Sequence, residues 1–405
     1  VAAPNVRVTP TPFSSPELPA LLTGGLGRDL PVQLERGRQV IATLLGARPS
    51  TSVLRPPGAV VDAASLRELA QQGIGSVVVG PGTVVPTPQP LGFAGPPVAA
   101  IGNGDAVEAI VPEPAVATIL QGGLVDQDPV LTAQIVLGEL ASIWQERPGE
   151  PRGIAVVLPE DGALPAGFYV PFARVIAGAP WLRPMHAAEL AAAFPATEPT
   201  PLAPAILRAF GSSYVEQLKQ ARRLIVTYRS MLAEESDAPA RLEDLLLLAE
   251  SRQFLSNPSD GLAFIARARD AVESVFGGIS LQTVDVITLT SSSGSGIPVT
   301  VSNGSEEALH LTLRLDSQNL REPESSELEL GPGASETVRF NVELKTTGRF
   351  QVQVQVVSPG GRVIQAHSIV VRSTAYNRTA LIITGLAALA LLVLWARRFV
   401  PRRTS

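Results

Sequence analysis

Five side chains of the types used in acid–base catalysis stand where predicted helices or strands end. They occur in the segments VDQDPVL, LPEDGAL and RPMHAAEL and are Asp126, Asp128, Glu160, Asp161 and His186. A pair of carboxylates about 5–10 Å apart can hydrolyse a glycosidic bond, and an α/β barrel places its catalytic groups directly after its strands. These five residues are therefore the candidate catalytic residues.

A purely structural interpretation of the same five residues is the one we favour. Asp128 stands before a proline, which is typical of a helix N-cap followed by the first helical position. The Glu160–Asp161 pair fits a turn, and His186 fits the start of a helix or a packing position. We therefore predict that none of these residues is catalytic.

The sequence gives little support to metal or cofactor chemistry. The chain has three histidines and no cysteine, which excludes disulfides, thiolate metal sites and cysteine nucleophiles. It contains no H-x-x-x-H, H-E-x-x-H, G-x-S-x-G or P-loop pattern. We predict no metal site and no cofactor. His310 and His367 fall on the polar side of alternating segments, so we expect both at the surface.

The elements that must position these residues begin with an α/β region over residues 1–195. In VVDAASLRELAQQGIGSVVVG, Asp62 is a plausible N-cap, Gly73 ends the helix, and 77–79 is a buried strand. PPVAAIG, VEAIVPEP and RGIAVVLP read as further strands, which predicts a parallel sheet with helical crossovers, part of an α/β barrel. Five or six strands cannot close such a barrel, so we expect the native protein to begin upstream, with a signal peptide.

A proline-rich break, PATEPTPLAP, leads into a helical segment over residues 205–277. Its first helix has a broad apolar face, and LEDLLLLAE adds four consecutive leucines. A unit of this size cannot bury all of that surface by itself. We expect most of it to pack on the barrel, while a remainder around Leu245 and Leu248 could form a groove for a partner.

From residue 279 to 374 the hydrophobic period changes to two. Seven short alternating segments follow one another, with turn signals such as Asn303-Gly304 between them. Seven strands in a region of this length predict an immunoglobulin-like β-sandwich.

The chain carries no charge from Thr379 to Ala396. A helix of that length spans about 26 Å, at the short end of what crosses a bilayer; a buried core helix is the alternative. The expected membrane anchor includes Thr379, Leu381, Leu386, Leu391 and Trp395. The basic tail, 397–405, contains Arg397, Arg398, Arg402 and Arg403. The positive-inside rule places this tail in the cytoplasm, so we predict a single-pass protein of the cell membrane with its ectodomain outside.

The segments TPTPFSSPELPALLTGGLG, APWLRPMHAAEL, SSSGSGIPVTVSNG and VRSTAYNRTALIITG carry a family resemblance over nearly the whole chain. They resemble an actinobacterial family of single-pass membrane proteins of unknown function, encoded beside the lipid II flippase of peptidoglycan synthesis. The resemblance implies a middle domain similar to polysaccharide-deacetylase and glycosidase barrels, and Arg55-Pro56-Pro57 is similar to the Arg-Pro-Pro turn of deacetylases. The metal ligands of deacetylases are missing here.

Together these observations predict a membrane-anchored extracytoplasmic envelope protein, either a non-catalytic scaffold or a binding protein linked to cell-wall assembly. The alternative is a carbohydrate-active enzyme, hydrolase-like or deacetylase-like, that acts on cell-wall polysaccharide. The expected partners are the lipid bilayer and, beyond it, envelope-assembly proteins or cell-wall glycan. The net charge of −5 and the lack of any basic run before the tail argue against nucleic acid.

Overall fold

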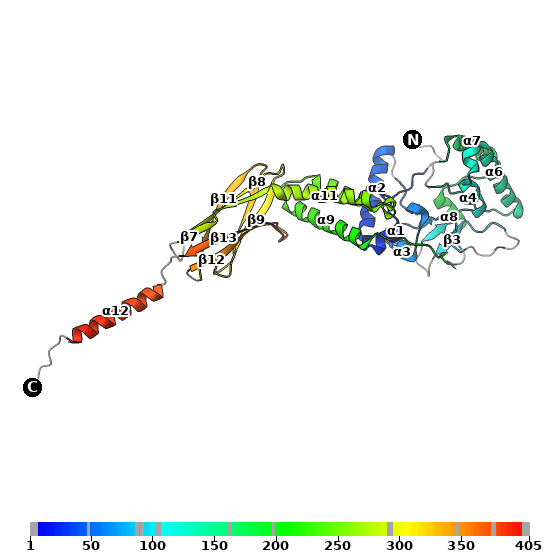
Figure 1. Cartoon of the computed structure of the whole chain (residues 1–405). Helices are drawn as coiled ribbons and strands as arrows, with labels where there is room; N and C mark the ends of the chain where they lie inside the picture. The colour runs from blue at the N-terminus through cyan, green and yellow to red at the C-terminus, as the bar shows by residue number, and fades with distance from the viewer. Residues whose placement is uncertain are drawn as a thin grey trace, which may run out of the picture. The chain divides into compact units, whose positions relative to one another are not determined.

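The computed structural model describes residues 7–398, apart from 47–48, 86–88, 90–92, 102–106, 161–163, 197–198, 290–294, 346–347 and 374–377. The chain divides into two compact units (Figure 1). The first unit contains residues 1–219 and 244–265, and the second contains residues 220–243 and 266–405.

An open, half-barrel sheet forms the centre of the first unit. Its strands are β1 (Val53–Leu54), β2 (Ser76–Val78), β3 (Val98–Ile101), β4 (Glu108–Ile110) and β5 (Pro199–Thr200), in the order β1-β2-β4-β3-β5. β1, β2 and β4 run parallel, as predicted. β3 runs antiparallel to β4, contrary to the all-parallel prediction. β3 ends at Ile101 and β4 begins at Glu108, and a parallel pair needs a connection of a dozen residues or more.

Two further segments of this sheet differ from their predictions. RGIAVVLP, expected as a full strand, makes a single parallel bridge between Ala155 and Pro112. Proline has no N–H group to extend a ladder, which accounts for the short pairing. Residues 199–200, inside the proline-rich stretch expected to separate two domains, form edge strand β5 beside β3. An edge is where a strand tolerates proline.

The helices of this unit up to residue 193 are α1 (Leu18–Thr23), α2 (Leu30–Leu45), α3 (Ala63–Gln71), α4 (Pro114–Gln121), α5 (Leu124–Gln127), α6 (Pro129–Glu146), α7 (Ala166–Gly178) and α8 (Ala187–Ala193). The predicted cap of α3 is present, because the Asp62 carboxylate accepts a hydrogen bond from the Ser65 N–H at 2.8 Å. Gly73 follows α3 with a φ of 78°, a left-handed conformation that glycine adopts without strain.

Three longer helices follow in the chain: α9 (Ser212–Met231), α10 (Ala238–Ala249) and α11 (Pro258–Gly278). The boundary between the two units passes through each of them. The predicted apolar face of α9 is buried, and Leu218 and Ile225 are both 0% exposed. On α10, Leu246 and Leu247 are buried, while Leu245 and Leu248 are half-buried. These side chains are therefore wholly or partly buried in the structure, and the partner groove expected around Leu245 and Leu248 stays a prediction.

The second unit contains two sheets. One has the order β10-β9-β12-β13-β7 and the other β11-β8-β6. The strands are β6 (Ile279–Thr283), β7 (Val286–Leu289), β8 (Ser295–Asn303), β9 (Leu309–Asp316), β10 (Glu324–Leu330), β11 (Ser335–Val342), β12 (Gly348–Val357) and β13 (Val363–Ser373). One hydrophobic core draws side chains from both sheets, including Val299, Leu313, Phe340 and Val354.

The first strand predicted in this region is in fact two strands. β6 pairs with β8 in one sheet, and β7 pairs in parallel with β13 in the other. The break falls at Val284 and Asp285, where the Asp285 carbonyl accepts a hydrogen bond from the Val370 N–H at 2.8 Å. The chain thereby changes sheets within a segment whose alternating pattern reads as continuous.

Helix α12 (Arg378–Arg398) follows the second unit's last strand. Its exposed large apolar side chains are Ile382, Ile383, Leu386, Leu389, Leu391, Leu392, Val393, Leu394 and Trp395. Over the residues that the structure describes, no helix combines the length and the apolarity needed to cross a membrane.

Candidate functional site

A cavity of about 710 Å³ lies in the first unit, at the carboxyl end of β4. Its apolar wall includes Val84, Phe93, Val111, Ile143 and Ile154. The charged side chains that line it are Glu113, Glu139 and Glu146. The volume is in the range typical of pockets that hold small molecules, about 300–1,000 Å³.

Glu113 reaches the cavity because β4 ends three residues before it. Pro112 interrupts the strand, and Pro114 begins α4 at the first helical position, so Glu113 is the extended residue between the two elements. Its N–H donates to the Ala155 carbonyl at 3.0 Å. This bond fixes the backbone of Glu113 to the segment that forms another wall of the cavity.

The environment of Glu113 favours its protonated form. Partial burial raises the pKa of this carboxyl, the neighbouring charges of Glu139 and Glu146 raise it further, and a backbone hydrogen bond from Ala115 and the charge of Arg152 oppose the rise. A carboxyl group with a raised pKa at a strand end can donate or accept a proton in a less acidic medium than an exposed glutamate.

Glu139 and Glu146 come from one face of α6. They are separated by seven residues, or about two helical turns, which places them on the same side of the helix. The start of α6 is fixed by Asp128, whose carboxylate accepts from the Leu131 N–H at 2.9 Å. Ile143, between the two glutamates, is buried and lines the cavity.

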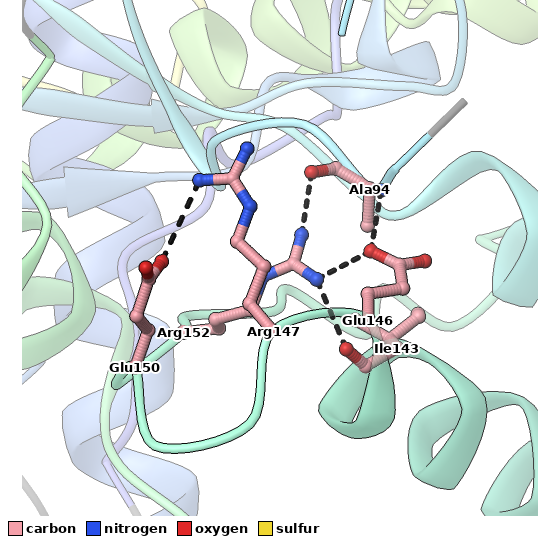
Figure 2. Close-up of polar contacts among 6 residues, drawn as sticks. All are labelled: Ala94, Ile143, Glu146, Arg147, Glu150 and Arg152. Atoms are coloured by element: carbon pink, nitrogen blue, oxygen red, sulfur yellow. Dashed lines mark hydrogen bonds and ion pairs between the residues drawn. The ribbon is translucent and has the colours of Figure 1, made fainter. Parts of the chain in front are cut away.

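Arg152 ties the end of α6 to the segment before β3 (Figure 2). Its guanidinium pairs with the Glu146 carboxylate and donates to the carbonyls of Ile143 at 2.9 Å and Ala94 at 2.6 Å. The Glu146 carboxylate in turn accepts from the Ala94 N–H at 3.0 Å. Charge-assisted bonds of this kind are stronger than neutral ones, so they hold Ala94 in place at the cavity wall.

Arg147 has a different role from Arg152. Its guanidinium lies over the Phe93 ring, 5.5 Å from the centroid, and contacts the Glu150 carboxylate at 3.5 Å. Both members of that ion pair are largely exposed, and Figure 2 draws them apart from the Arg152 contacts. Arg147 therefore covers a wall residue of the cavity from outside and does not line it.

None of the described candidate residues from the sequence lines this cavity. Asp128 caps α6, the structural role that we favoured, and Asp126 is exposed on α5. Glu160 accepts from the Gly58 N–H at 2.8 Å and lies 4.0 Å from Arg252. The His186 N–H donates to the Glu189 carboxylate at 3.2 Å, at the start of α8. Asp161 lies outside the described residues.

His310 and His367 are exposed on the second unit's strands, where the alternating pattern placed them. The nearest carboxylates are Glu329, 3.9 Å from His310, and Asp285, 3.3 Å from His367. Over the described part of the chain, no group of three or more metal-ligating side chains is arranged to hold a metal ion.

The sequence reasoning missed the three cavity glutamates. One signal could have found Glu113, because it follows the strand segment VEAIV after a single proline, as Glu160 follows RGIAVVL after a single proline. Glu139 and Glu146 carried no such signal. They read as the polar side of an amphipathic helix, and only the tertiary fold brings that side to the cavity.

Comparison with solved structures gives distant likenesses. The α-amylase AmyC from Thermotoga maritima is 12% identical with a TM-score of 0.46, and the match covers 66% of this chain and 65% of the amylase. A β-glucosidase from Listeria innocua is 17% identical with a TM-score of 0.17, over 24% of this chain and 16% of the enzyme. WR4, an MSP family member from C. elegans, is 8% identical with a TM-score of 0.18, over 24% of this chain and 98% of WR4.

The chain thus spans less than two thirds of the amylase and less than a fifth of the β-glucosidase. No curated protein matches it significantly. A family model matches residues 38–403, which is most of the sequence. The chain belongs to DUF6049, a family of unknown function.

Proposed function

We propose that the chain is a membrane-anchored extracytoplasmic envelope protein that acts as a non-catalytic scaffold or binding protein. In this proposal α12 enters the lipid bilayer, the arginines after Trp395 face the cytoplasm, and both compact units work on the outer side. The link to cell-wall assembly comes from the resemblance to actinobacterial proteins encoded beside the lipid II flippase. The same proposal includes an immunoglobulin-like fold for the second unit.

The observation that carries the attachment is the exposure of α12. Nine large apolar side chains between Ile382 and Trp395 are 55–69% exposed. A patch of this kind marks a surface that is covered by a membrane or a protein. The sequence around it has no charge from Thr379 to Ala396 and then four arginines, a pattern that favours the bilayer.

The contacts of the acidic side chains in the first unit support the non-catalytic character. Asp128 is used as a helix cap and Glu160 as an acceptor for a turn N–H. Glu146 is neutralised by Arg152. A glycosidase needs two carboxylates across one bond, one protonated and one ionised; among the described lining residues only Glu113 stands at a strand end, whereas Glu139 comes from helix α6.

A carbohydrate-active enzyme is the second candidate, and one observation favours it. Glu113 follows a strand, lines a cavity and has a raised pKa, as a general acid would. Purified chain should nevertheless leave peptidoglycan and cell-wall polysaccharide intact. Turnover that disappears in Glu113→Gln would replace the scaffold proposal with the enzyme.

Membrane attachment is tested by fractionating cells that express the full chain. We expect the chain in the alkaline-washed membrane fraction, and we expect Leu386→Arg combined with Leu389→Arg to release it, since each central arginine costs about 2.5–3.5 kcal/mol of insertion. Ile206→Arg is the matched control, because Ile206 is 94% exposed in the first unit. The chain that carries this substitution should stay in the membrane fraction. The proposal would be overturned if the wild-type chain appeared in the soluble fraction. It would also be overturned if the double-arginine variant and Ile206→Arg divided equally between the membrane and soluble fractions.

The scaffold role is tested by purification through a tag on the cytoplasmic tail after mild detergent extraction. We expect envelope proteins or glycan to co-purify with the wild-type chain in a defined ratio. A chain that is membrane-bound and folded but purifies alone would contradict the scaffold role while leaving the attachment intact.

A further inference from the structure

We propose that the cavity at the carboxyl end of β4 binds an organic ammonium ion with an apolar body. This inference deepens the proposed binding role, because it names the ligand class of one site. It does not depend on α12, so its failure would leave the membrane attachment standing.

The charge of the cavity selects a cation. Every charged side chain among the described lining residues is a glutamate, and no lysine, arginine or histidine is among them. Arg152 is not among the lining residues, and its guanidinium pairs with the Glu146 carboxylate. Glu113 and Glu139 are then the carboxyl groups for which the described lining offers no cation, and an ammonium group would complement them.

The walls select an apolar body for that cation. Val84, Val111, Ile143 and Ile154 and the ring of Phe93 form the surface between the glutamates. Prolines 96, 97, 112 and 114 add rigid apolar faces without side-chain donors. An inorganic cation would leave this apolar surface exposed to water. An alkyl or ring-shaped body covers the surface, and removing both apolar surfaces from water favours binding.

Glu113 links this binding to protons. The groups that act on it are Glu139 and Glu146 from α6, which disfavour its charge, and Arg152, which favours it; Ala115 donates a backbone hydrogen bond to it. A bound ammonium ion would stabilise ionised Glu113, lower its raised pKa and release a proton. Affinity should therefore fall as the pH drops through the range where Glu113 takes up its proton.

The probe is cyclohexylammonium, with uncharged cyclohexanol as its isostere. Both are titrated calorimetrically into the full chain held in lipid nanodiscs, with empty nanodiscs subtracted. We expect saturable binding of the ammonium ion at one site per chain and at least about tenfold weaker binding of the alcohol, because the alcohol leaves the carboxylates unpaired. Repeating the titration in two buffers of different ionisation enthalpy should reveal proton release.

Variants assign the binding to the cavity. Glu113→Gln and Glu139→Gln should each lower the affinity for the ammonium ion at least about tenfold. Glu113→Gln should also abolish the proton release on binding. Glu150→Gln is the matched control, since Glu150 pairs with Arg147 and does not line the cavity. The affinity of this variant for the ammonium ion should stay within about twofold of the wild-type value. Tryptophan fluorescence from the stacked Trp144–Trp181 pair verifies that each variant is folded.

Three results would overturn the inference: no saturable binding of the ammonium ion, equal affinity for the alcohol, or equal losses in Glu139→Gln and Glu150→Gln. Each of these results is obtained with chain that is held in lipid nanodiscs. None would therefore be confused with failure of the anchor.

Discussion

The guanidinium of Arg152 and the carboxylate of Glu146 form an ion pair in which the two side chains are only 15% and 21% exposed. The pair connects the last turn of α6 to the chain before β3, because both residues also bond to the backbone of Ala94. One contact thus holds two walls of the cavity together.

Breaking this pair should destabilise the first unit. Arg152→Met removes the partner of the half-buried Glu146 carboxylate and two further donated bonds, to the carbonyls of Ile143 and Ala94, so we expect a loss of about 1–3 kcal/mol in the free energy of unfolding. Arg147→Met is the matched control, because its ion pair with Glu150 is exposed and long, and it should cost less than about 1 kcal/mol. Urea unfolding followed by tryptophan fluorescence measures both; equal losses would show that the Arg152 contacts carry no special weight.

The stability of the first unit should depend on the protonation of Glu113. Its pKa is raised in the folded chain, so the folded state binds the proton more tightly than the unfolded state does. The contribution of Glu113 to the free energy of unfolding is therefore greatest below the pKa that this carboxyl has in the unfolded chain. It is lost as the pH rises through the raised pKa of the folded chain.

Glu113→Gln removes this dependence. The variant should gain stability relative to wild type as the pH rises through that window, and the two should converge in acid. Urea midpoints measured across the window test the sign. A wild-type chain that becomes relatively more stable than the variant at higher pH would contradict the burial argument.

Two glycines should respond in opposite directions to alanine. A Cβ on Gly37 would lie 1.8 Å from the Thr11 carbonyl oxygen, so Gly37→Ala must separate α2 from that segment and should cost about 1–3 kcal/mol. Gly138 is exposed within α6, with nothing within 4 Å of the added atom. Gly138→Ala should stabilise by about 0.5–1 kcal/mol. Chemical denaturation of the two variants side by side checks the contrast, and loss of stability in both would refute it.

Asn303 should be essential to the second unit. It is 1% exposed, and its amide donates to the carbonyls of Glu307, Leu330 and Gly331 at 2.8, 2.9 and 3.1 Å. Asn303→Ala leaves these acceptors without that donor and should cost about 1–3 kcal/mol. Thr300→Ala, which loses the exposed hydroxyl contact with Thr337, should change stability by less than about 0.5 kcal/mol. Hydrogen exchange of β8 and β10 reports the difference; protection that is equally retained in both would argue against it.

The sequence predicted the elements whose signals are local. Asp62 and Asp128 were recognised as caps because an N-cap is defined by the residues beside it. The two-residue alternation of β9 was also predicted from the sequence. Its apolar side is buried in one core, which contains Leu309, Leu311, Leu313 and Leu315.

The features that could not be predicted depend on distant partners. Nothing in VAAIG states that β3 pairs antiparallel with β4, and the alternating pattern of residues 281–290 runs through the point where the chain leaves one sheet for another. The cavity follows the same rule. Glu146 contacts Arg152 and the Ala94 N–H, and the sequence alone does not predict that these groups lie beside α6.

The most direct test of the central claim is the side of the membrane on which each end of the chain lies. The chain has no cysteine of its own, so single cysteines can be placed at Ser335, exposed on β11, and at Ser405 in the tail. In intact cells an impermeant thiol reagent should label Ser335→Cys and leave Ser405→Cys unlabelled until the membrane is opened. Labelling of Ser405→Cys but not Ser335→Cys in intact cells would contradict the account.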